Sequence, residues 1–166
     1  MRIISGRSKG RKIHEPKDLN TRPLKDLTKE SIFNILTHSN KFVIKLKNSN
    51  VLDLFSGVGS FGLECLSRET SNVTFVENYD NVLPVLKKNI LDLDYQENSL
   101  VIENDIFNNL DLIIFKKKFD IIFMDPPYKE KKITTLLNKI IQSDILSNDG
   151  IIIIHRHKKE GDEFPE

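Results

Sequence analysis

The sequence predicts a doubly wound α/β fold with a mostly parallel sheet. Short apolar segments alternate along the chain with longer segments of helical periodicity, which is typical of parallel strands joined by helices. Two of the apolar segments, 121–123 and 151–154, are apolar at every position, and this indicates strands that are buried on both faces of a sheet. The 166 residues suffice for one core, so we expect one main domain.

The first 22 residues are predicted to form a β-hairpin extension to a main domain at 23–166. Ser5-Gly6 and Lys9-Gly10 provide two turn signals within a weakly alternating segment. A helix is predicted at about 23–37, because Pro23 suits the first turn of a helix. We expect Phe33 and Asn34 to point away from its apolar face, which would contain Leu24, Leu27, Ile32, Ile35 and Leu36.

The remaining elements are predicted to alternate regularly. Strands are expected at 51–55, 73–76, 100–102, 119–124 and 151–154. Helices are expected between them at about 60–68, 80–93 and 131–143, where apolar residues recur at helical spacing. Cys65 falls in the first of these helices, where we expect a small buried side chain, because a single cysteine forms no internal disulfide.

Positive charge is concentrated at the start of the chain. Residues 1–25, which we name the basic arm, contain eight of the 25 Lys and Arg residues but only two of the 24 acidic ones. Clustered cations attract phosphates, so the arm is a candidate for contact with a polyanion, with Arg7, Lys9 and Arg11 as the candidate side chains. An ordinary solvated basic tail is the alternative.

We expect a cytoplasmic protein with no membrane partner, and we expect it to be a monomer. No apolar run approaches the roughly 20 residues that cross a bilayer. The opening MRIISGRSKGRK has no apolar core behind its charges, so it does not resemble a secretion signal. No metal site is expected, and surface positions are predicted for the four histidines, His14, His38, His155 and His157.

A nucleotide-binding site is predicted at the ends of the strands expected at 51–55 and 73–76. Ligands of open parallel sheets bind beyond the carboxyl ends of the strands. There, Gly57, Gly59 and Gly62 spell GxGxxG, and Glu77 lies at the usual distance for a carboxylate that binds a ribose diol. The pattern fits a nicotinamide dinucleotide or S-adenosylmethionine, whereas a tight turn with no ligand is the structural alternative.

The strand predicted at 119–124 is followed by Asp125-Pro126-Pro127-Tyr128. This motif favours transfer of a methyl group to an amine of a nucleic-acid base. An exocyclic amine is a poor nucleophile because its lone pair is delocalised into the ring. If the Asp125 carboxylate and the Pro126 carbonyl accept both amine hydrogens, the lone pair is freed for attack. Pro127 helps to fix that carbonyl, and Tyr128 would stack on the base.

With these motifs, the chain resembles the RsmD family of bacterial 16S ribosomal RNA guanine-N2 methyltransferases. The segments that carry the likeness are RIISGRSKGRKI, TRPLKDLTKESIFNIL, VLDLFSGVGSFGLE, FVEN, END and FDIIFMDPPY. The resemblance implies a Rossmann-like class I methyltransferase fold whose N-terminal hairpin helps to grip RNA. It also implies S-adenosylmethionine as cofactor, and ribosomal RNA or an assembling small-subunit particle as partner.

The resemblance also implies roles for particular residues. Cofactor contacts are implied for Asp53, Phe55, Gly57, Gly59, Glu77, Asn104 and Asp105. Among these, Glu77 would hold the ribose, and Asn104 and Asp105 would border the adenine. The target base would lie against residues 125–128, and Arg22 of the TRP segment would face the active site or an RNA phosphate.

The sequence departs from the family pattern at two places. Leu24 follows TRP where the family usually has threonine. The sequence also stops at GDEFPE, just beyond the last predicted strand, where the family continues into an antiparallel pair of strands. We therefore expect a sheet with five core strands.

Three other functions are considered. A DNA adenine-N6 methyltransferase would use the same DPPY chemistry, but the TRP segment and the lack of an extended DNA-recognition domain disfavour it. A dinucleotide-dependent oxidoreductase would leave DPPY unexplained. A non-catalytic RNA-binding assembly factor would keep its biological role after Asp125 is replaced by alanine.

Overall fold

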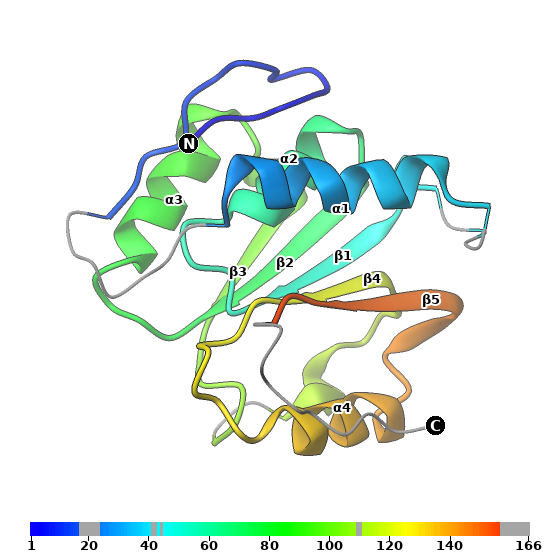
Figure 1. Cartoon of the computed structure of the whole chain (residues 1–166). Coiled ribbons are helices and arrows are strands. Elements are labelled where there is room, and N and C mark those ends of the chain that lie inside the picture. The colour runs from blue at the N-terminus through cyan, green and yellow to red at the C-terminus, as the bar shows by residue number, and fades with distance from the viewer. Residues whose placement is uncertain (17–23, 41–42, 44, 109–110, 157–166) are drawn as a thin grey trace.

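Five parallel strands form one sheet in the order β3-β2-β1-β4-β5 (Figure 1). The computed structural model describes residues 1–16, 24–40, 43, 45–108 and 111–156. The strands are β1 (Asn50–Leu54), β2 (Asn72–Glu77), β3 (Ser99–Glu103), β4 (Phe119–Met124) and β5 (Leu146–Ile154). The predicted class, α/β with a mostly parallel sheet, is confirmed.

The strand order places a topological switch point at β1. From β1 the chain moves outward through β2 to β3, and it then returns to the other side of β1 to form β4 and β5. The helical connections after β1 and β4 therefore leave in opposite directions. A crevice at the carboxyl ends of β1 and β4 follows from this order, and this is where open α/β sheets bind their ligands.

Helices cover both faces of the sheet (Figure 1). Three lie on one face, α1 (Asp26–His38), α2 (Ser60–Ser67) and α3 (Leu83–Asp92), and α4 (Ile133–Gln142) lies on the other. Successive strand residues point to opposite faces, so Ile121 packs in the core under α1 to α3 whereas Ile122 packs in the core over α4. No helix in the described part of the chain has the length and hydropathy needed to cross a membrane.

Most predicted element boundaries agree with the structure. Helix α1 begins at Asp26 and not at residue 23. Two further differences have local causes. Helix α3 begins at Leu83 and not at residue 80, with Pro84 in its first turn, where the missing N–H of proline costs no intrahelical bond. Strand β5 begins at Leu146 and not at residue 151, because an irregularity in the β4–β5 pairing accommodates its polar segment 147–150.

The predicted apolar face of α1 is partly wrong. Phe33 is fully buried, whereas Leu27 and Ile35 are 78% and 57% exposed. The Phe33 ring stacks on Phe61 of α2 at 5.1 Å between centroids, and this contact orients the helix. Lys29, four residues earlier on the same face, is also fully buried.

The basic arm begins as a hairpin-shaped loop that packs on the helices. Its two sides meet in one antiparallel bridge between Arg2 and Lys12. Ile3 and Ile13 are buried in the core beneath α1 to α3. The fully buried Glu64 of α2 accepts hydrogen bonds from the N–H groups of Ile4 and Ser5 at 2.8 and 2.9 Å. Residues 1–16 therefore share a core with the rest of the chain, and the predicted domain boundary at 22 lies outside the described residues.

Candidate active site

A cavity of about 590 Å³ opens at the carboxyl ends of the central strands. Its walls come from the ends of β1, β2, β4 and β5, and from the first turn of α1 and the residues before it. Three acidic side chains line it: Asp53 of β1, Glu77 of β2 and Asp125 after β4. The predicted motif at the tip of β4 and the predicted glycine turn after β1 therefore face the same space.

The turn after β1 brings its backbone to the cavity wall. Gly57 lines the cavity with a φ of +55°, and a Cβ atom at this position would meet no atom within 4 Å. Phe55, which also lines the cavity, has a φ of +59°, a value that is rare for a residue with a side chain. Gly62 has another role, because a Cβ atom there would lie 2.3 Å from the Phe75 ring of β2, so glycine lets α2 approach the sheet.

Backbone hydrogen bonds hold the carboxylate of Glu77 in place. One oxygen accepts the N–H of Gly57 at 2.7 Å, and the other accepts those of Asn78 and Tyr79 at 2.9 and 3.0 Å. The carboxylate is therefore fixed directly against the glycine turn. A carboxylate oxygen has more than one lone pair, so this group can still accept hydrogen bonds from a ligand in the cavity.

Asp53 provides a buried carboxyl group beneath the cavity. It is 1% exposed and accepts the N–H of Gly62, in the first turn of α2, at 3.0 Å. Burial raises the pKa of Asp53 well above its usual value, because the ionised form loses its hydration. The Gly62 hydrogen bond opposes this rise in pKa, whereas the negative charges of Asp125 and Glu77 add to it.

The DPPY segment leaves β4 at the cavity. Asp125, Pro126, Pro127 and Tyr128 all line it. The Asp125 side chain is 21% exposed, and one of its carboxylate oxygens lies 2.8 Å from Nδ1 of His155. The expectation that His155 is a surface residue is wrong, because its side chain lies against the cavity and is 28% exposed. His14 and His38 are exposed as predicted, and His157 lies outside the described residues.

Three of the implied cofactor residues do not line the cavity: Gly59, Asn104 and Asp105. Gly59 shapes the start of α2, with its N–H bonded to the carbonyl of Ser56 at 2.8 Å. After β3, the Asn104 side chain accepts the N–H of Asp105 at 2.8 Å, and Asp105 in turn accepts the N–H of Phe107 at 2.8 Å. These two side chains therefore support the turn after β3.

The candidate RNA residues of the basic arm lie outside the cavity lining. Arg7, Lys9 and Arg11 are all exposed. The Arg7 guanidinium lies 4.4 Å above the centre of the Tyr95 ring, and Arg11 is 3.7 Å from the Asp94 carboxylate. Arg22 falls in the segment 17–23, outside the described residues.

Several residues that line the cavity were not selected from the sequence: Leu24, Lys25, Thr28, Tyr79 and His155. The first three follow Thr21-Arg22-Pro23 in a segment that resembles the family, and this position could have identified them. Tyr79 follows Glu77 by two positions, so its place just after a predicted strand could have identified it too. For His155, only its position directly after a predicted strand pointed to the site.

Comparisons with known proteins agree along nearly the whole chain. A family model described as Conserved hypothetical protein 95 matches residues 1–165. The chain is 36% identical to YlbH of Bacillus subtilis, over 100% of this chain and 86% of that protein. It is 33% identical to ribosomal RNA small subunit methyltransferase D of Buchnera aphidicola subsp. Acyrthosiphon pisum, over 99% of this chain and 82% of that protein.

Solved structures share the fold. The yhhF protein of Escherichia coli superposes with a TM-score of 0.77 at 28% identity, over 99% of this chain and 86% of that one. SMU.776, solved in complex with SAH, superposes with a TM-score of 0.61 at 21% identity, over 78% of this chain and 35% of that one. On the full-length match of the family model and of its relatives, the chain belongs to the RsmD family of ribosomal RNA small subunit methyltransferases.

Proposed function

We propose that this chain transfers a methyl group from S-adenosylmethionine to the exocyclic N2 amine of a guanine in 16S ribosomal RNA. One observation carries the proposal: Asp125 and its two prolines line the same cavity as the glycine turn and Glu77. The names of its relatives support ribosomal RNA as the substrate class, and SAH in a protein of the same fold supports the cofactor.

The cavity suits an adenosine-bearing cofactor. Its volume lies in the range of small-molecule sites, about 300–1,000 Å³. The Glu77 carboxylate, fixed by three backbone N–H groups, would accept hydrogen bonds from the ribose hydroxyls. At Gly57 no side chain screens the backbone, so the cofactor can approach it closely.

The residues after β4 would then prepare the amine. When bound, S-adenosylmethionine supplies an electrophilic methyl group on a sulfonium. The Asp125 carboxylate and the Pro126 carbonyl would accept the two hydrogens of the amine and turn its lone pair toward that methyl group. The lone pair would form the new N–C bond, and the C–S bond would break and leave its electron pair on sulfur. Asp125 or water then takes the surplus proton from nitrogen, so a strong base is not required.

The target base would lie between the cofactor and Tyr128. Stacking on an aromatic ring contributes about 1–3 kcal/mol per base in proteins that bind single strands. A guanine N2 inside a stacked helix is hard to reach, so we propose a base that is unpaired or flipped out. Arg7, Lys9, Arg11 and Arg22 of the basic arm would hold the RNA backbone through its phosphates.

Replacing Asp125 by alanine tests the proposal. We expect methyl transfer to small-subunit RNA to fall about a hundredfold or more, because the variant loses an acceptor that orients the amine. Binding of S-adenosylmethionine should persist, since the glycine turn and Glu77 are untouched. The matched control is Asp149→Ala, an exposed aspartate in β5 away from the cavity lining.

The measurement is transfer of labelled methyl to RNA, small-subunit particles and DNA, followed by mass spectrometry of the modified base. Label on guanine N2 supports the proposal, and label on adenine N6 of DNA would replace it with the DNA methyltransferase alternative. Retained transfer by Asp125→Ala would contradict the role assigned to the carboxylate.

A further inference from the structure

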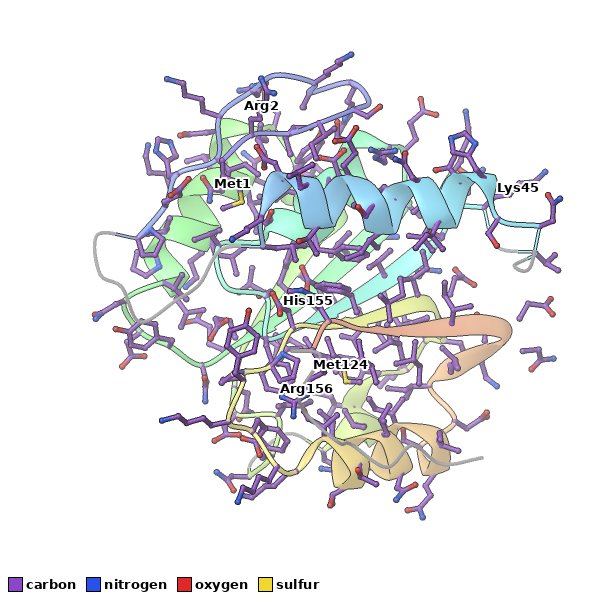
Figure 2. All side chains as sticks on the ribbon, viewed as in Figure 1. Met1, Arg2, Lys45, Met124, His155 and Arg156 are labelled. Carbon is purple, nitrogen blue, oxygen red and sulfur yellow. The ribbon has the colours of Figure 1, made fainter. Side chains whose placement is uncertain are left out.

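Two consecutive residues after β5 hold the segment that follows β4. The pairing of the two strands ends at Met124 and Ile154, and the N–H of His155 then donates to the Met124 carbonyl at 2.9 Å. This bond extends the ladder past the last strand pair and brings the His155 ring beside Asp125. Figure 2 shows His155 and Arg156 at this end of β5, next to the chain that leaves β4.

The His155 side chain contacts the Asp125 carboxylate directly. Its Nδ1 atom lies 2.8 Å from Oδ1 of Asp125. An ionised carboxylate has only acceptors, so the contact requires a proton on Nδ1, which donates to Oδ1. Because the ring is anchored through its own backbone N–H, the bond restricts the rotation of the Asp125 side chain.

Arg156 fixes the backbone on the other side of Asp125. Its guanidinium donates to the carbonyls of Pro127, Tyr128 and Glu130 at 3.2, 3.3 and 3.0 Å. Three carbonyls on one planar guanidinium keep this turn in a single shape. Arg156 therefore holds the backbone of the turn, and His155 contacts the Asp125 side chain.

We propose that His155 is a positioning residue for the methyl transfer, acting through Asp125 by holding its carboxylate in the orientation that accepts the amine. The inference rests on the proposed function of Asp125 and adds a residue outside the DPPY segment. A misplacement of about 1 Å at a reacting group can cost on the order of a hundredfold in rate. His155→Ala should therefore lower kcat about ten- to a hundredfold, with KM for RNA and the affinity for S-adenosylmethionine changed less than about threefold.

The variant His155→Asn distinguishes the effect of the hydrogen bond to Asp125 from the effect of the size of the side chain. The amide nitrogen of asparagine is as many bonds from the backbone as Nδ1 of histidine, so it can donate to the same oxygen. We expect His155→Asn to keep most of the wild-type kcat, whereas His155→Ala loses it. The matched control is His38→Ala, which removes an exposed histidine in the last turn of α1, outside the basic arm and the cavity lining.

The test measures kcat, KM and cofactor affinity for these variants and for His155→Ala combined with Asp125→Asn. In the double variant the decrease in kcat should be no greater than in Asp125→Asn alone, since His155 acts through the Asp125 carboxylate. A wild-type kcat in His155→Ala would overturn the inference, as would a loss of cofactor binding or a failure of asparagine to restore the rate. A wild-type protein that transfers no methyl to any RNA would instead refute the proposed function.

Discussion

At the scale of single residues, Asp53 lowers the stability of the fold near neutral pH. Its pKa is raised in the folded state, chiefly by burial, so the folded protein binds this proton more tightly than the unfolded chain does. The resulting stabilisation is complete below the unfolded pKa of about 3.9 and is lost as the pH rises through the folded value. A carboxyl group at this buried position therefore lowers the stability of the fold as the pH rises, which fits a side chain kept for its function.

We predict that Asp53→Asn stabilises the cofactor-free protein at neutral pH. Asparagine keeps an oxygen for the Gly62 N–H but does not ionise. The difference in Tm between the variant and the wild type should increase as the pH rises from about 3.9 toward the raised pKa of the folded state, because the unfolded wild type loses this proton first and the variant has no such proton. Thermal unfolding at several pH values measures this. A difference that stays constant or shrinks as the pH rises would refute it.

At the scale of elements, α1 buries Phe33 together with Leu36, whereas Leu27 and Ile35, which its sequence pattern also favours, are exposed. Phe33 stacks on Phe61, which in turn stacks on Phe123 of β4 at 3.9 Å between centroids. The three rings join the helix to the strand that ends at Asp125. The helix therefore supports the site, because its first turn also lines the cavity through Thr28.

Phe33→Ala is predicted to lower the free energy of unfolding by about 3–5 kcal/mol, the usual cost of removing a buried aromatic ring. Ile35→Ala on the same helix is the control, since Ile35 is 57% exposed and its loss should change stability by no more than about 0.5 kcal/mol. Denaturant unfolding of both variants provides the comparison. Equal effects of the two substitutions would mean that Phe33 does not orient α1.

The sequence predicted the strands better than the faces of the helices. A buried parallel strand such as Ile121–Met124 is apolar on both faces, so its pattern needs no knowledge of its neighbours. In α1, the buried face includes Lys29, whose ammonium group donates to the Arg2 carbonyl at 2.8 Å and lies 3.7 Å from Glu64. A charged residue lowers the apparent hydrophobicity of that face, and its partners lie far away in the sequence.

The candidate site shows the same division. Glu77 and Asp125 could be selected from the sequence because each stands at the end of a strand or directly after one, where the topology brings ligands. The bond from His155 to Asp125 joins side chains 30 positions apart, and no local pattern predicts such a pair. Whereas His155 was missed, Asp105 was selected but does not line the cavity. It follows β3 as expected, but its carboxylate accepts the N–H of Phe107 in its own turn.

At the scale of the whole molecule, the basic arm combines two roles in one segment. Ile3 and Ile13 fill the core beneath α1 to α3, while Arg7, Lys9 and Arg11 between them are exposed. Deleting the arm would therefore remove core residues along with the positive charge. A loss of RNA binding after such a deletion would not distinguish contact with RNA from unfolding, so the arm has to be tested by single charge reversals.

Lys9→Glu is predicted to weaken RNA association without lowering stability. Lys9 is exposed, so its reversal leaves the core intact, whereas a lost phosphate contact should reduce the slope of log affinity against log salt concentration by about one. The control is Lys45→Glu, the same charge change beyond the end of α1 and well away from the arm, as the positions of Lys45 and Arg2 in Figure 2 indicate. Binding of small-subunit RNA over a range of salt concentrations, with thermal unfolding alongside, measures both properties. If the two reversals weaken binding equally, net charge accounts for the effect and the arm is not the RNA-binding surface.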